Sequence, residues 1–449
     1  MTDKMTDRCR QYLAELEKMP LLADAVGRTA GREDIRGNVN RLVLGPVIHG
    51  YVLWLLSSAV KDGIQRLYFL ARDGYLPYRI AQEICRELDL PVECRYFYCS
   101  RAALRVPMYH RDIPGALDHI CRGGMNVTPE RILLRAGLDP ERAGELFPQL
   151  VLPWDWDEVI PYARLGEVRE LLGKNEIFLE AMCNASSKAF PAIHGFFRQS
   201  GILEPGRFAI VDSGWTGTMQ RSIRDICEAC AGRAELTGYY FGLYHLPEGS
   251  NRDRYSSFFF SPEQGLWNKV QFNNNLFEVV FSAPHGTCMG YRMNGGIAEA
   301  VLGEPRAEIV GYIRDCEEQM TEFTCALLKD LTSSKIAKIS IEHLQAMNLG
   351  LLRRFMCNPT PQEAEAFGTL PFSDELQDAG IRELAERLTG RELWRNHALP
   401  RILGLLGLGS GEPRQSGWFE GSAIRHGRFR LWHLWSYRFY KLLLYLRRR

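Results

Sequence analysis

The sequence lacks a large net charge. Its 55 lysines and arginines nearly balance 54 aspartates and glutamates, which leaves a formal net charge of +1. The balance is uneven, because the last 25 residues hold eight of the cations and no acid, so the other 424 residues carry a net charge of −7. An acidic body with a basic end argues against a broad nucleic-acid groove and predicts one localised contact with an anionic partner.

The sequence also lacks features typical of secreted or zinc-stabilised proteins. Residues 1–8 are polar, whereas a secretory leader has an apolar core, so we expect a cytoplasmic protein. The twelve cysteines are scattered, and Cys227 and Cys230 have metal or redox spacing but no second pair at a matching distance. We interpret them as packed thiols in a reducing compartment.

One run, residues 42–60, has no Asp, Glu, Lys or Arg and is long enough to be considered as a membrane span. Gly45, Pro46 and His49 interrupt this run, which continues through a short polar turn directly into a strand. We therefore predict a buried helix that packs on a sheet.

Short apolar strands alternate with amphipathic helices along much of the chain. Strands are predicted at residues 67–70, 94–99, 208–211 and 236–244, and helices at 75–88, 216–230, 306–331 and 339–355. This alternation is typical of parallel sheets built from βαβ units. The expected fold class is α/β, a Rossmann-like parallel sheet with inserted and C-terminal helical regions.

The same pattern predicts five parts of the chain. Residues 1–111 are expected to form N-terminal helices and the first half of the α/β core, and 112–200 an inserted helical lobe. Residues 201–300 are expected to complete the core, 301–424 to form a C-terminal helical region, and 425–449 a basic aromatic tail.

Residues 212–218 (DSGWTGT) follow an apolar strand and precede a helix, as a phosphate-binding loop does. Two glycines permit a tight turn, two threonines add hydroxyl donors, and Asp212 is placed to accept hydrogen bonds from sugar hydroxyls. An ordinary strand-to-helix turn is the alternative. The predicted binding residues are Asp212, Ser213, Gly214, Trp215, Thr216, Gly217 and Thr218.

A second group of polar residues follows the first two predicted strands. Arg72, Asp73 and Gly74 come after one strand, and Ser100 and Arg101 after the next. The carboxyl ends of parallel strands form the ligand crevice of an open α/β sheet. Two arginines there suit a pyrophosphate, and the carboxylate suits Mg²⁺ or its water. The alternative is that the first arginine and its neighbouring aspartate cap a helix or pair with each other.

A third group lies in an Asn- and aromatic-rich stretch, residues 273–291. Amides, carboxylates and aromatic rings are typical of sugar-binding clefts. Glu278 or His285 is a candidate base for an acceptor hydroxyl, and we favour Glu278. A hydrogen-bonded loop with a satisfied histidine is the alternative.

Together these motifs resemble two related groups of proteins. Residues 208–212 and 216–220 resemble the ribose-phosphate loop of type I phosphoribosyltransferases, although Ser213 stands where that family has a second acid. Residues 69–75, 99–101 and 211–218 are more similar to a bacterial polysaccharide-biosynthesis group that resembles the enzymes placing ribofuranose in surface glycans. Members of this group are often labelled haloacid-dehalogenase-type hydrolases. The resemblance covers residues 42–291.

The resemblance implies a Mg²⁺-dependent glycosyltransferase of the phosphoribosyl type. Its donor would be phosphoribosyl pyrophosphate, and its acceptor a sugar hydroxyl of a lipid-linked glycan. Thr216, Gly217 and Thr218 would hold the 5-phosphate and Asp212 the ribose. Arg72, Asp73, Ser100 and Arg101 would hold the pyrophosphate and the metal. Partner glycosyltransferases and a phosphatase that removes the 5-phosphate are also implied.

Two other functions stay open at this point. A haloacid-dehalogenase-type phosphatase needs an Asp-x-Asp string directly after a strand, and Asp155 and Asp157 fit the string. However, Pro153 interrupts any strand ahead of them, so we interpret this match as a coincidence. The third possibility is a membrane-docked scaffold that binds a sugar phosphate or nucleotide without turnover.

The tail, residues 425–449, combines aromatic residues, leucines and eight cations, and is too charged to span a bilayer. We expect it to lie on the inner face of the membrane, with the cations facing anionic lipid. The residues expected to enter the lipid are Trp432, Trp435, Phe439, Leu442 and Tyr445. A helix docked on the protein core, or on a partner protein, is the alternative.

Overall fold

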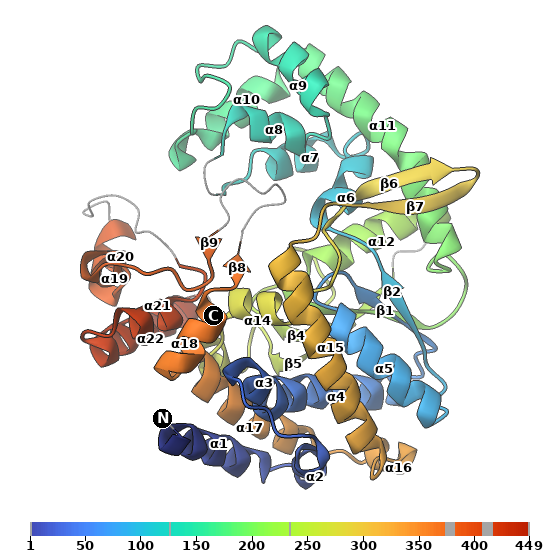
Figure 1. The fold of residues 1–449 in the computed structure, drawn as a ribbon. Coiled ribbons are helices and arrows are strands. Elements are labelled where there is room, and N and C mark those ends of the chain that lie inside the picture. The colour runs from blue at the N-terminus through green and yellow to red at the C-terminus, as the bar shows by residue number, and fades with distance from the viewer. Residues whose placement is uncertain (1, 125–126, 233–234, 373–381, 406–415, 448–449) are drawn as a thin grey trace.

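The computed structural model describes residues 2–124, 127–232, 235–372, 382–405 and 416–447 (Figure 1). At its centre is a parallel five-stranded sheet in the order β2-β1-β3-β4-β5. The strands are β1 (Arg66–Leu70), β2 (Glu93–Phe97), β3 (Phe208–Trp215), β4 (Thr237–Leu243) and β5 (Tyr255–Phe260). The predicted α/β fold, a Rossmann-like parallel sheet with helical regions, is confirmed.

Helices cover both faces of the sheet, so its strands are apolar on both sides. In β1, Leu67 and Phe69 join one hydrophobic core, whereas Tyr68 and Leu70 join the core on the opposite face. The first core is completed by α4 (Gly45–Lys61), α5 (Tyr75–Glu87), α15 (Ala307–Leu328) and α17 (Ile341–Leu352). The second is completed by α6 (Arg101–Arg105), α11 (Glu176–Gln199) and α12 (Thr218–Ala231).

The strand order determines where a ligand crevice can form. From β1 the chain runs outward to β2 and then returns to the other side of β1 as β3. Such a reversal opens a crevice at the carboxyl ends of the two central strands, where open α/β sheets bind ligands. The segments that follow β1, β2 and β3 therefore meet at one edge of the sheet.

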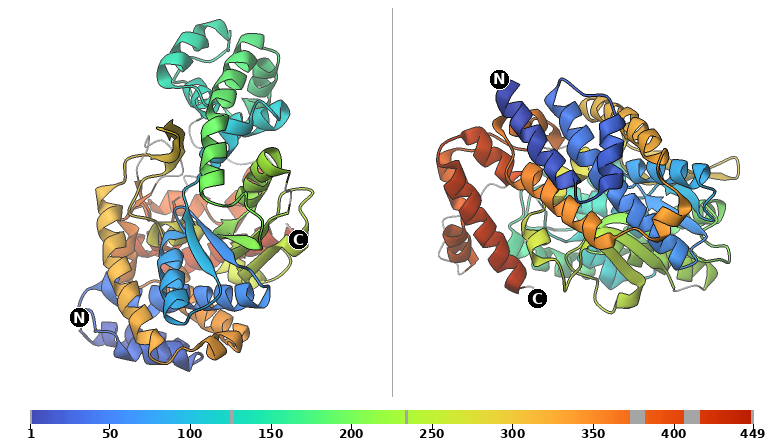
Figure 2. Two further views of the ribbon diagram at one scale, coloured as in Figure 1. Left: turned by 90° about the vertical axis from the view of Figure 1, so that its right-hand side faces the viewer. Right: turned by 90° about the horizontal axis from the view of Figure 1, so that it is seen from below.

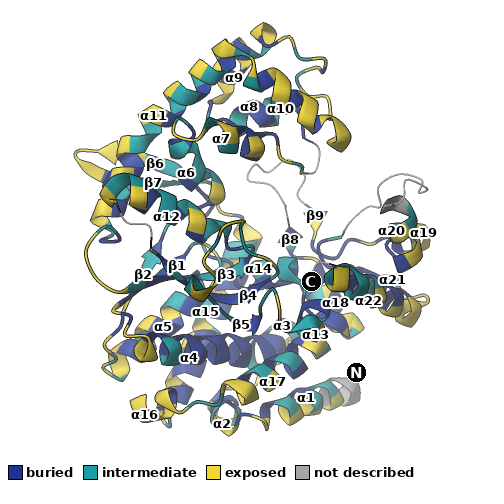
Figure 3. Cartoon of the chain, turned by 180° about the vertical axis from the view of Figure 1, so that it is seen from behind, coloured by how far each residue is buried: buried dark blue, intermediate teal, exposed yellow. Residues whose placement is uncertain are grey.

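The uncharged run, residues 42–60, is buried as predicted. Within the described ranges, one helix, Ile35–Lys61, is long and apolar enough to cross a membrane, but 83% of its most apolar window is buried inside the protein. This helix comprises α3 (Ile35–Val39), a short π-helical segment and α4, and Figure 3 shows α4 as a mostly buried helix beneath the sheet.

A helical lobe stands apart from the sheet (Figures 1 and 2). It contains α7 (Ile113–Ile120), α8 (Pro129–Arg135), α9 (Pro140–Leu146), α10 (Leu165–Gly173) and the first part of α11. These helices enclose a hydrophobic core of their own, with Ile132, Leu146, Val168 and Phe178 fully buried. Because α11 continues from the lobe to the sheet, it joins the two cores.

Strand β3 is longer than the sequence predicted. Residues 212–215 were expected to form a loop, but they continue the strand and pair with β4. The two strands approach closely at Gly214 and Gly242, where a Cβ atom on Gly214 would lie 1.9 Å from the Gly242 carbonyl oxygen. The predicted loop is therefore reduced to Thr216 and Gly217. Gly214 is required for the close pairing of β3 with β4.

Several elements were not predicted. They include β5, which precedes the Asn- and aromatic-rich stretch, and an antiparallel hairpin of β6 (Cys288–Asn294) and β7 (Ile297–Leu302), which begins at its end. Short β8 (Pro371–Phe372) pairs with β9 (Arg382–Glu383). The remaining helices of this half are α13 (Leu266–Val270), α14 (Asn274–Val280), α16 (Ser333–Ala337) and α18 (Pro361–Gly368), and α1 (Thr2–Leu16) and α2 (Pro20–Arg28) pack beneath the sheet.

The C-terminal helices α19 (Gly390–Arg395), α20 (Ala398–Leu405), α21 (Phe419–His426) and α22 (Arg430–Arg447) form the side of the molecule coloured red in Figure 1. One face of α22 docks on the body: buried Lys441 donates to the Phe272 carbonyl at 2.8 Å and lies 3.4 Å from Glu420. Tyr445 stacks on Tyr244, with 5.3 Å between ring centroids.

The predicted membrane tail is therefore corrected in part. Tyr445, expected in lipid, faces the protein, and Arg425, Arg438 and Lys441 bind protein groups instead of facing lipid. Trp432, Trp435 and Phe439 remain exposed, and Leu442 is half-buried. Arg448 and Arg449 lie outside the described residues.

Candidate functional site

Two aspartates meet at the crevice between β1 and β3. Asp73 lies in the turn after β1, and its Oδ2 accepts a hydrogen bond from Ser213 Oγ at 2.5 Å. Asp212 precedes that serine in β3, and desolvation together with the negative charge of Asp73 raises its pKa. Ser213 stands where type I phosphoribosyltransferases have a second acid. In this fold it is hydrogen-bonded to Asp73, an acid from the turn after the neighbouring strand.

Glu278 of α14 joins the same cluster through Trp215. The indole Nε1 of Trp215 donates to Glu278 Oε1 at 2.6 Å. The indole ring is fixed by Phe272, 5.0 Å away between centroids, and by Phe277 at 5.7 Å. Trp215 was predicted to touch substrate, but in the structure its polar atom positions Glu278.

The three acids share a poorly solvated place, which raises their pKa values. Desolvation and the charge of Asp73 raise the pKa of Asp212 to about 8. The same two effects raise the pKa of Glu278 to about 7, although the Trp215 hydrogen bond lowers it. Desolvation also raises the pKa of Asp73, against the hydrogen bond from Ser213. Acids poised near neutral pH in a crevice are typical of functional sites.

One oxygen of the cluster has no partner. The Oδ2 atom of Asp212 is buried and receives no hydrogen bond within the described residues. A buried carboxylate oxygen without a donor is costly, so this atom is a natural place for a ligand hydroxyl or a cation.

Arg72 and Arg101 lie at the same edge of the sheet. Their positive charges favour the ionised forms of the acids. Both charges lower the pKa of Asp73 and of Glu278, and Arg101 also lowers that of Asp212. In the part of the chain that the structure describes, neither guanidinium forms a hydrogen bond or ion pair. Both arginines are exposed, so they remain available to an anionic ligand.

The shortened loop, which was predicted to bind phosphate, leads directly into α12. Gly217 has φ of +63°, and a Cβ atom there would lie 2.7 Å from the Tyr255 ring, so both conformation and packing require glycine. The hydroxyl oxygens of Thr216 and Thr218 lie 3.2 Å apart at the start of the helix. Two hydroxyls beside a helix N-terminus keep the features that phosphate binding needs.

Gly74 and Ser100 serve the local backbone. The amide of Gly74 donates to the Leu70 carbonyl at 2.9 Å, and a Cβ atom there would clash with that same oxygen. The Ser100 hydroxyl accepts from the Ala103 amide at 3.1 Å and caps α6. Both residues were predicted to bind substrate, and the structure shows that they shape the turns which place Asp73 and Arg101.

His285 is a satisfied histidine, in line with the alternative interpretation. Its Nδ1 lies 2.8 Å from the Gly286 carbonyl, to which it donates, and its Nε2 lies 2.7 Å from the Tyr96 hydroxyl. Desolvation lowers its pKa, and Arg72 lowers it further. The neighbouring amides are also occupied: Asn273 caps α14 and, like Asn275, donates to the Gly417 carbonyl.

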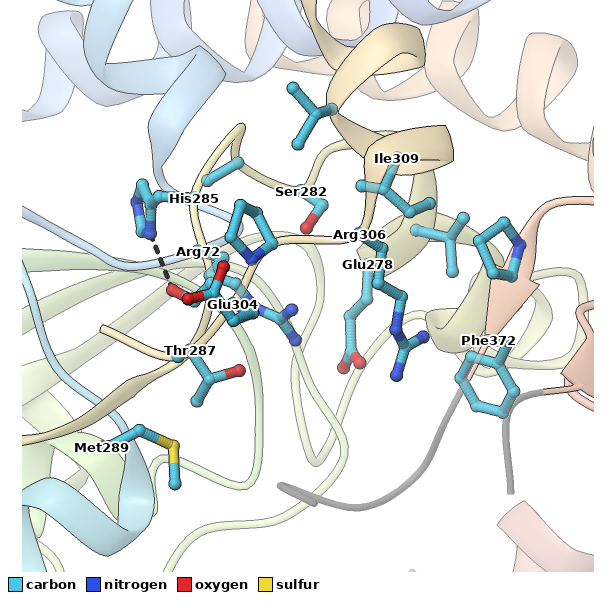
Figure 4. Close-up of a pocket in the computed structure, with 17 residues that line it drawn as sticks. Arg72, Glu278, Ser282, His285, Thr287, Met289, Glu304, Arg306, Ile309 and Phe372 are labelled. Carbon is cyan, nitrogen blue, oxygen red and sulfur yellow. Dashed lines mark hydrogen bonds between the residues drawn. The ribbon is translucent and has the colours of Figure 1, made fainter. Parts of the chain in front are cut away.

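A cavity of about 120 Å³ opens beside Glu278 (Figure 4). Its wall combines α14, the loop before β6 and the start of α15. Figure 4 shows the carboxylate of Glu278 and the guanidinium groups of Arg72 and Arg306 directed toward it. The cavity adjoins the acid cluster through Glu278, which belongs to both.

The phosphatase string does not follow a strand. Asp155 and Asp157 lie in an irregular segment of the helical lobe, between α9 and α10, and Glu158 accepts a hydrogen bond from the Asp155 amide. The strand that must precede a nucleophilic aspartate is missing among the described residues at this place. The interpretation of this string as a coincidence agrees with its position.

Sequence reasoning missed a group of arginines next to the site. The charges of Arg101 and Arg221 both act on Arg105. The four-residue spacing of Arg101 and Arg105 after a strand was the available signal, because it places both on one side of a helix. Arg221 gave no such signal, since its closeness to α6 depends on how α12 packs.

The comparisons with known proteins leave the family open. No protein-family model matches the chain, and a search of curated proteins finds no match. The resemblance to phosphoribosyltransferases therefore stays a prediction, and the geometry of the crevice carries the argument for function.

Proposed function

We propose that the chain is a Mg²⁺-dependent phosphoribosyltransferase of surface polysaccharide biosynthesis. It would move 5-phosphoribosyl from phosphoribosyl pyrophosphate to a sugar hydroxyl of a glycan and release pyrophosphate. The observation that supports this proposal most is the juxtaposition, at the sheet's reversal point, of an acid cluster, two unpaired arginines and a helix N-terminus.

The donor has two phosphate-bearing ends and a diol between them, and the crevice offers a complement to each. Thr216 and Thr218, with the start of α12, suit the 5-phosphate. Arg72 and Arg101 suit the pyrophosphate, because a guanidinium can bind two of its oxygens at once. The unpartnered oxygen of Asp212 suits a ribose hydroxyl.

Glu278 is our candidate for the base. It borders the cavity, and its pKa of about 7 is close to cytoplasmic pH, which suits general base catalysis. The carboxylate would take the proton from the acceptor hydroxyl. The acceptor oxygen would bond to C1 of the ribose while the C1–O bond to pyrophosphate breaks, and pyrophosphate would leave with the electron pair.

The residues present are compatible with Mg²⁺. Within the described ranges, no three His, Cys, Asp or Glu side chains are arranged as a metal site. Mg²⁺ usually takes one or two carboxylates and completes its shell with phosphate oxygens and water. Asp73 and Asp212, whose charges repel and one of whose oxygens lacks a partner, would hold it. The ion would supply charge stabilisation for the departing pyrophosphate.

We also propose that the protein works on the inner face of the membrane. Aromatic side chains of α22 project from its outer face: Trp432 and Trp435 are 55% and 62% exposed, and their rings stack on each other. Exposed Arg428 and Arg430 lie at the same end of the helix. Aromatic groups flanked by cations suit an anionic lipid surface, where a lipid-linked acceptor would be found. Partner glycosyltransferases and a phosphatase remain part of this proposal.

Thermal shift measurements and pyrophosphate release test the enzyme. Phosphoribosyl pyrophosphate with Mg²⁺ should raise the melting temperature more than nucleotide sugars do, and pyrophosphate should appear only when a lipid-linked glycan is added. Release of inorganic phosphate without acceptor would instead support a phosphatase. Ligand-dependent stabilisation with no product would support a scaffold.

Vesicle sedimentation tests the location. Binding to vesicles that contain anionic lipid should fall when Trp432 and Trp435 are both replaced by Ser. The matched control is Trp394→Ser, which removes one exposed tryptophan from α19 outside the α22 face. Equal binding of all variants would remove α22 as the contact.

A further inference from the structure

The short helix that carries Glu278 is held in place by the C-terminal part of the chain. This helix, α14, has seven residues, Asn274–Val280. The side chain of its N-cap residue, Asn273, donates to the Gly417 carbonyl at 3.1 Å, and that of Asn275 donates to the same oxygen at 3.2 Å. A helix this short has little stability of its own, so tertiary contacts determine where it lies.

A buried lysine of α22 contacts the backbone just ahead of α14. Lys441 is 6% exposed, and its Nζ donates to the Phe272 carbonyl at 2.8 Å. Phe272 directly precedes the N-cap residue of α14, and α13, the helix before it, packs against α22. The lysine therefore fixes the backbone from which α14 starts.

Lys441 keeps its charge in this buried position. Its Nζ lies 3.4 Å from Oε1 of Glu420 in α21, which is fully buried. Desolvation disfavours the charged lysine, but the charges around it, that of Glu420 first, outweigh this effect and raise its pKa. Apolar side chains of the same volume often give as much stability as a buried ion pair. What the pair specifies is one docking position of α22, because the ammonium must lie between one carboxylate and one carbonyl.

Glu278 lies toward the other end of α14 and meets the sheet there. The indole Nε1 of Trp215, in β3, donates to its Oε1 at 2.6 Å. Between this contact and the lysine, α14 is a continuous helix that buries Leu276 and Phe277 in the core. A displacement of the backbone at Phe272 would therefore carry the Glu278 carboxylate away from the indole and from the cavity that it borders.

We propose that Lys441 is a positioning residue for Glu278: by binding the Phe272 carbonyl, it fixes the start of α14 and so keeps the carboxylate at the crevice. The role of Glu278 as a base rests on the proposed function, whereas the effect of Lys441 on its position does not. The helix that we propose to meet the membrane would then also set the position of the base.

The Trp215–Glu278 hydrogen bond gives a measurement of this effect that needs no catalysis. The variant is Lys441→Met combined with Glu420→Gln, because the lysine change alone would leave a buried carboxylate without its cation. Isotopic labelling of tryptophan gives an indole N–H signal for each ring by NMR, and Trp215→Phe identifies the relevant one. We expect the Trp215 signal to move in the double variant as its charge-assisted bond lengthens, while that of Trp154, in the helical lobe, stays in place.

The kinetics of transfer give a second measurement. The double variant should lower kcat about 10- to 100-fold, because a displacement of about 1 Å is enough to disable a catalytic group. The KM for phosphoribosyl pyrophosphate should change less than about twofold, since the residues proposed to bind the donor lie on other elements. Lys441→Arg, which keeps the charge and the donors, should retain most of kcat.

The matched control is Arg438→Gln. Arg438 lies about one turn before Lys441 in α22 and also donates to a backbone carbonyl, that of Cys357, but this residue does not lead into α14. The control should weaken the docking of α22 and leave both the Trp215 signal and kcat unchanged. An unmoved signal in the double variant, or an equal shift in the control, would overturn the inference.

The two proposals fail in different ways. Transfer with an unchanged kcat in the double variant would leave the proposed function standing and remove Lys441 as a positioning residue. A Trp215 signal that moves in the double variant but not in the control, in a protein that catalyses no transfer from phosphoribosyl pyrophosphate, would keep the position of α14 dependent on Lys441 and remove the proposed function.

Discussion

Two acids with buried carboxylate oxygens have opposite surroundings in this molecule. Glu363, in the first turn of α18, is 3% exposed and accepts four hydrogen bonds: two from Arg8 at 2.9 and 3.0 Å, one from the Tyr12 hydroxyl at 2.6 Å and one from the Thr360 amide at 2.7 Å. Asp212, at the crevice, has a buried oxygen with no donor and a pKa raised to about 8.

The difference separates a structural charge from a functional one. Glu363 joins α1 to α18 across the bottom of the molecule, and its donors compensate its loss of water. Asp212 is left partly uncompensated where the strand order reverses, beside two other acids. Burial alone therefore does not mark a site, whereas burial without partners at a ligand crevice does.

Removing Glu363 should have the largest effect on stability. Glu363→Ala leaves the largely enclosed Arg8 guanidinium without its carboxylate partner, so the free energy of unfolding should fall by about 3–5 kcal/mol. Urea denaturation measures this change. The control is Glu145→Ala in the helical lobe, whose exposed ion pair with Arg142 should contribute less than about 1 kcal/mol. Equal losses would erase the contrast between the two kinds of acid.

Removing the charge of Asp212 should mainly affect catalysis. Asp212→Asn should reduce phosphoribosyl transfer by about 10²- to 10³-fold, the loss expected when one preorganised polar contact is removed. Pyrophosphate release under saturating donor measures it. Glu363→Gln, assayed at a temperature where it stays folded, should keep near wild-type turnover. Full activity of Asp212→Asn would show that the unpartnered oxygen has no part in the reaction.

The next-largest difference between Asp212 and Glu363 should appear in the pH dependence of stability. Folding raises the pKa of Asp212 from its ordinary value near 4 to about 8, so the protonated form favours the fold. Its favourable contribution is complete below about pH 4 and is lost as pH rises through about 8. Asp212→Asn should therefore raise the melting temperature at pH 8.5 more than at pH 5. A constant difference across this range would contradict the raised pKa.

Mg²⁺ should act on the crevice alone. At pH 8, millimolar Mg²⁺ should raise the wild-type melting temperature by a few degrees, because a cation bound by Asp73 and Asp212 relieves their repulsion. EDTA should reverse the shift, and Asp73→Asn should abolish it. Glu363→Gln serves as the control and should respond like the wild type. A shift that survives Asp73→Asn would place the ion elsewhere.

Four of the five strands of the central sheet could be predicted, because each is a short apolar run bounded by polar turns. Arg72, Asp73 and Arg101 were placed correctly at the carboxyl edge of the sheet, since strand direction alone determines that edge. The end of β3 could not be predicted from the sequence. It depends on the close approach of Gly214 to Gly242, which belongs to a strand elsewhere in the sequence.

Contacts between elements that are distant in the sequence could not be predicted either. The Ser213–Asp73 hydrogen bond depends on β1 and β3 being neighbours, although 140 residues separate the two side chains. In α22, aromatic residues and cations alternate in a way that suits lipid, and only the packing of Lys441 against Phe272 shows which face docks on the protein. The local sequence pattern predicts helices and strands, whereas the contacts between their side chains depend on the tertiary arrangement.

The smallest effect should come from Trp215, which is hydrogen-bonded to Glu278, the third acid of the crevice. Its hydrogen bond lowers the pKa of Glu278 toward about 7, so Trp215→Phe should raise that pKa. Transfer should then fall a few-fold at pH 7 and recover at pH 8.5, as the base ionises again. Phe272→Leu is the control, because it disturbs the same ring packing but leaves the Trp215–Glu278 bond in place. If both variants lose activity equally at both pH values, Trp215 acts through packing alone and the tuning of Glu278 is disproved.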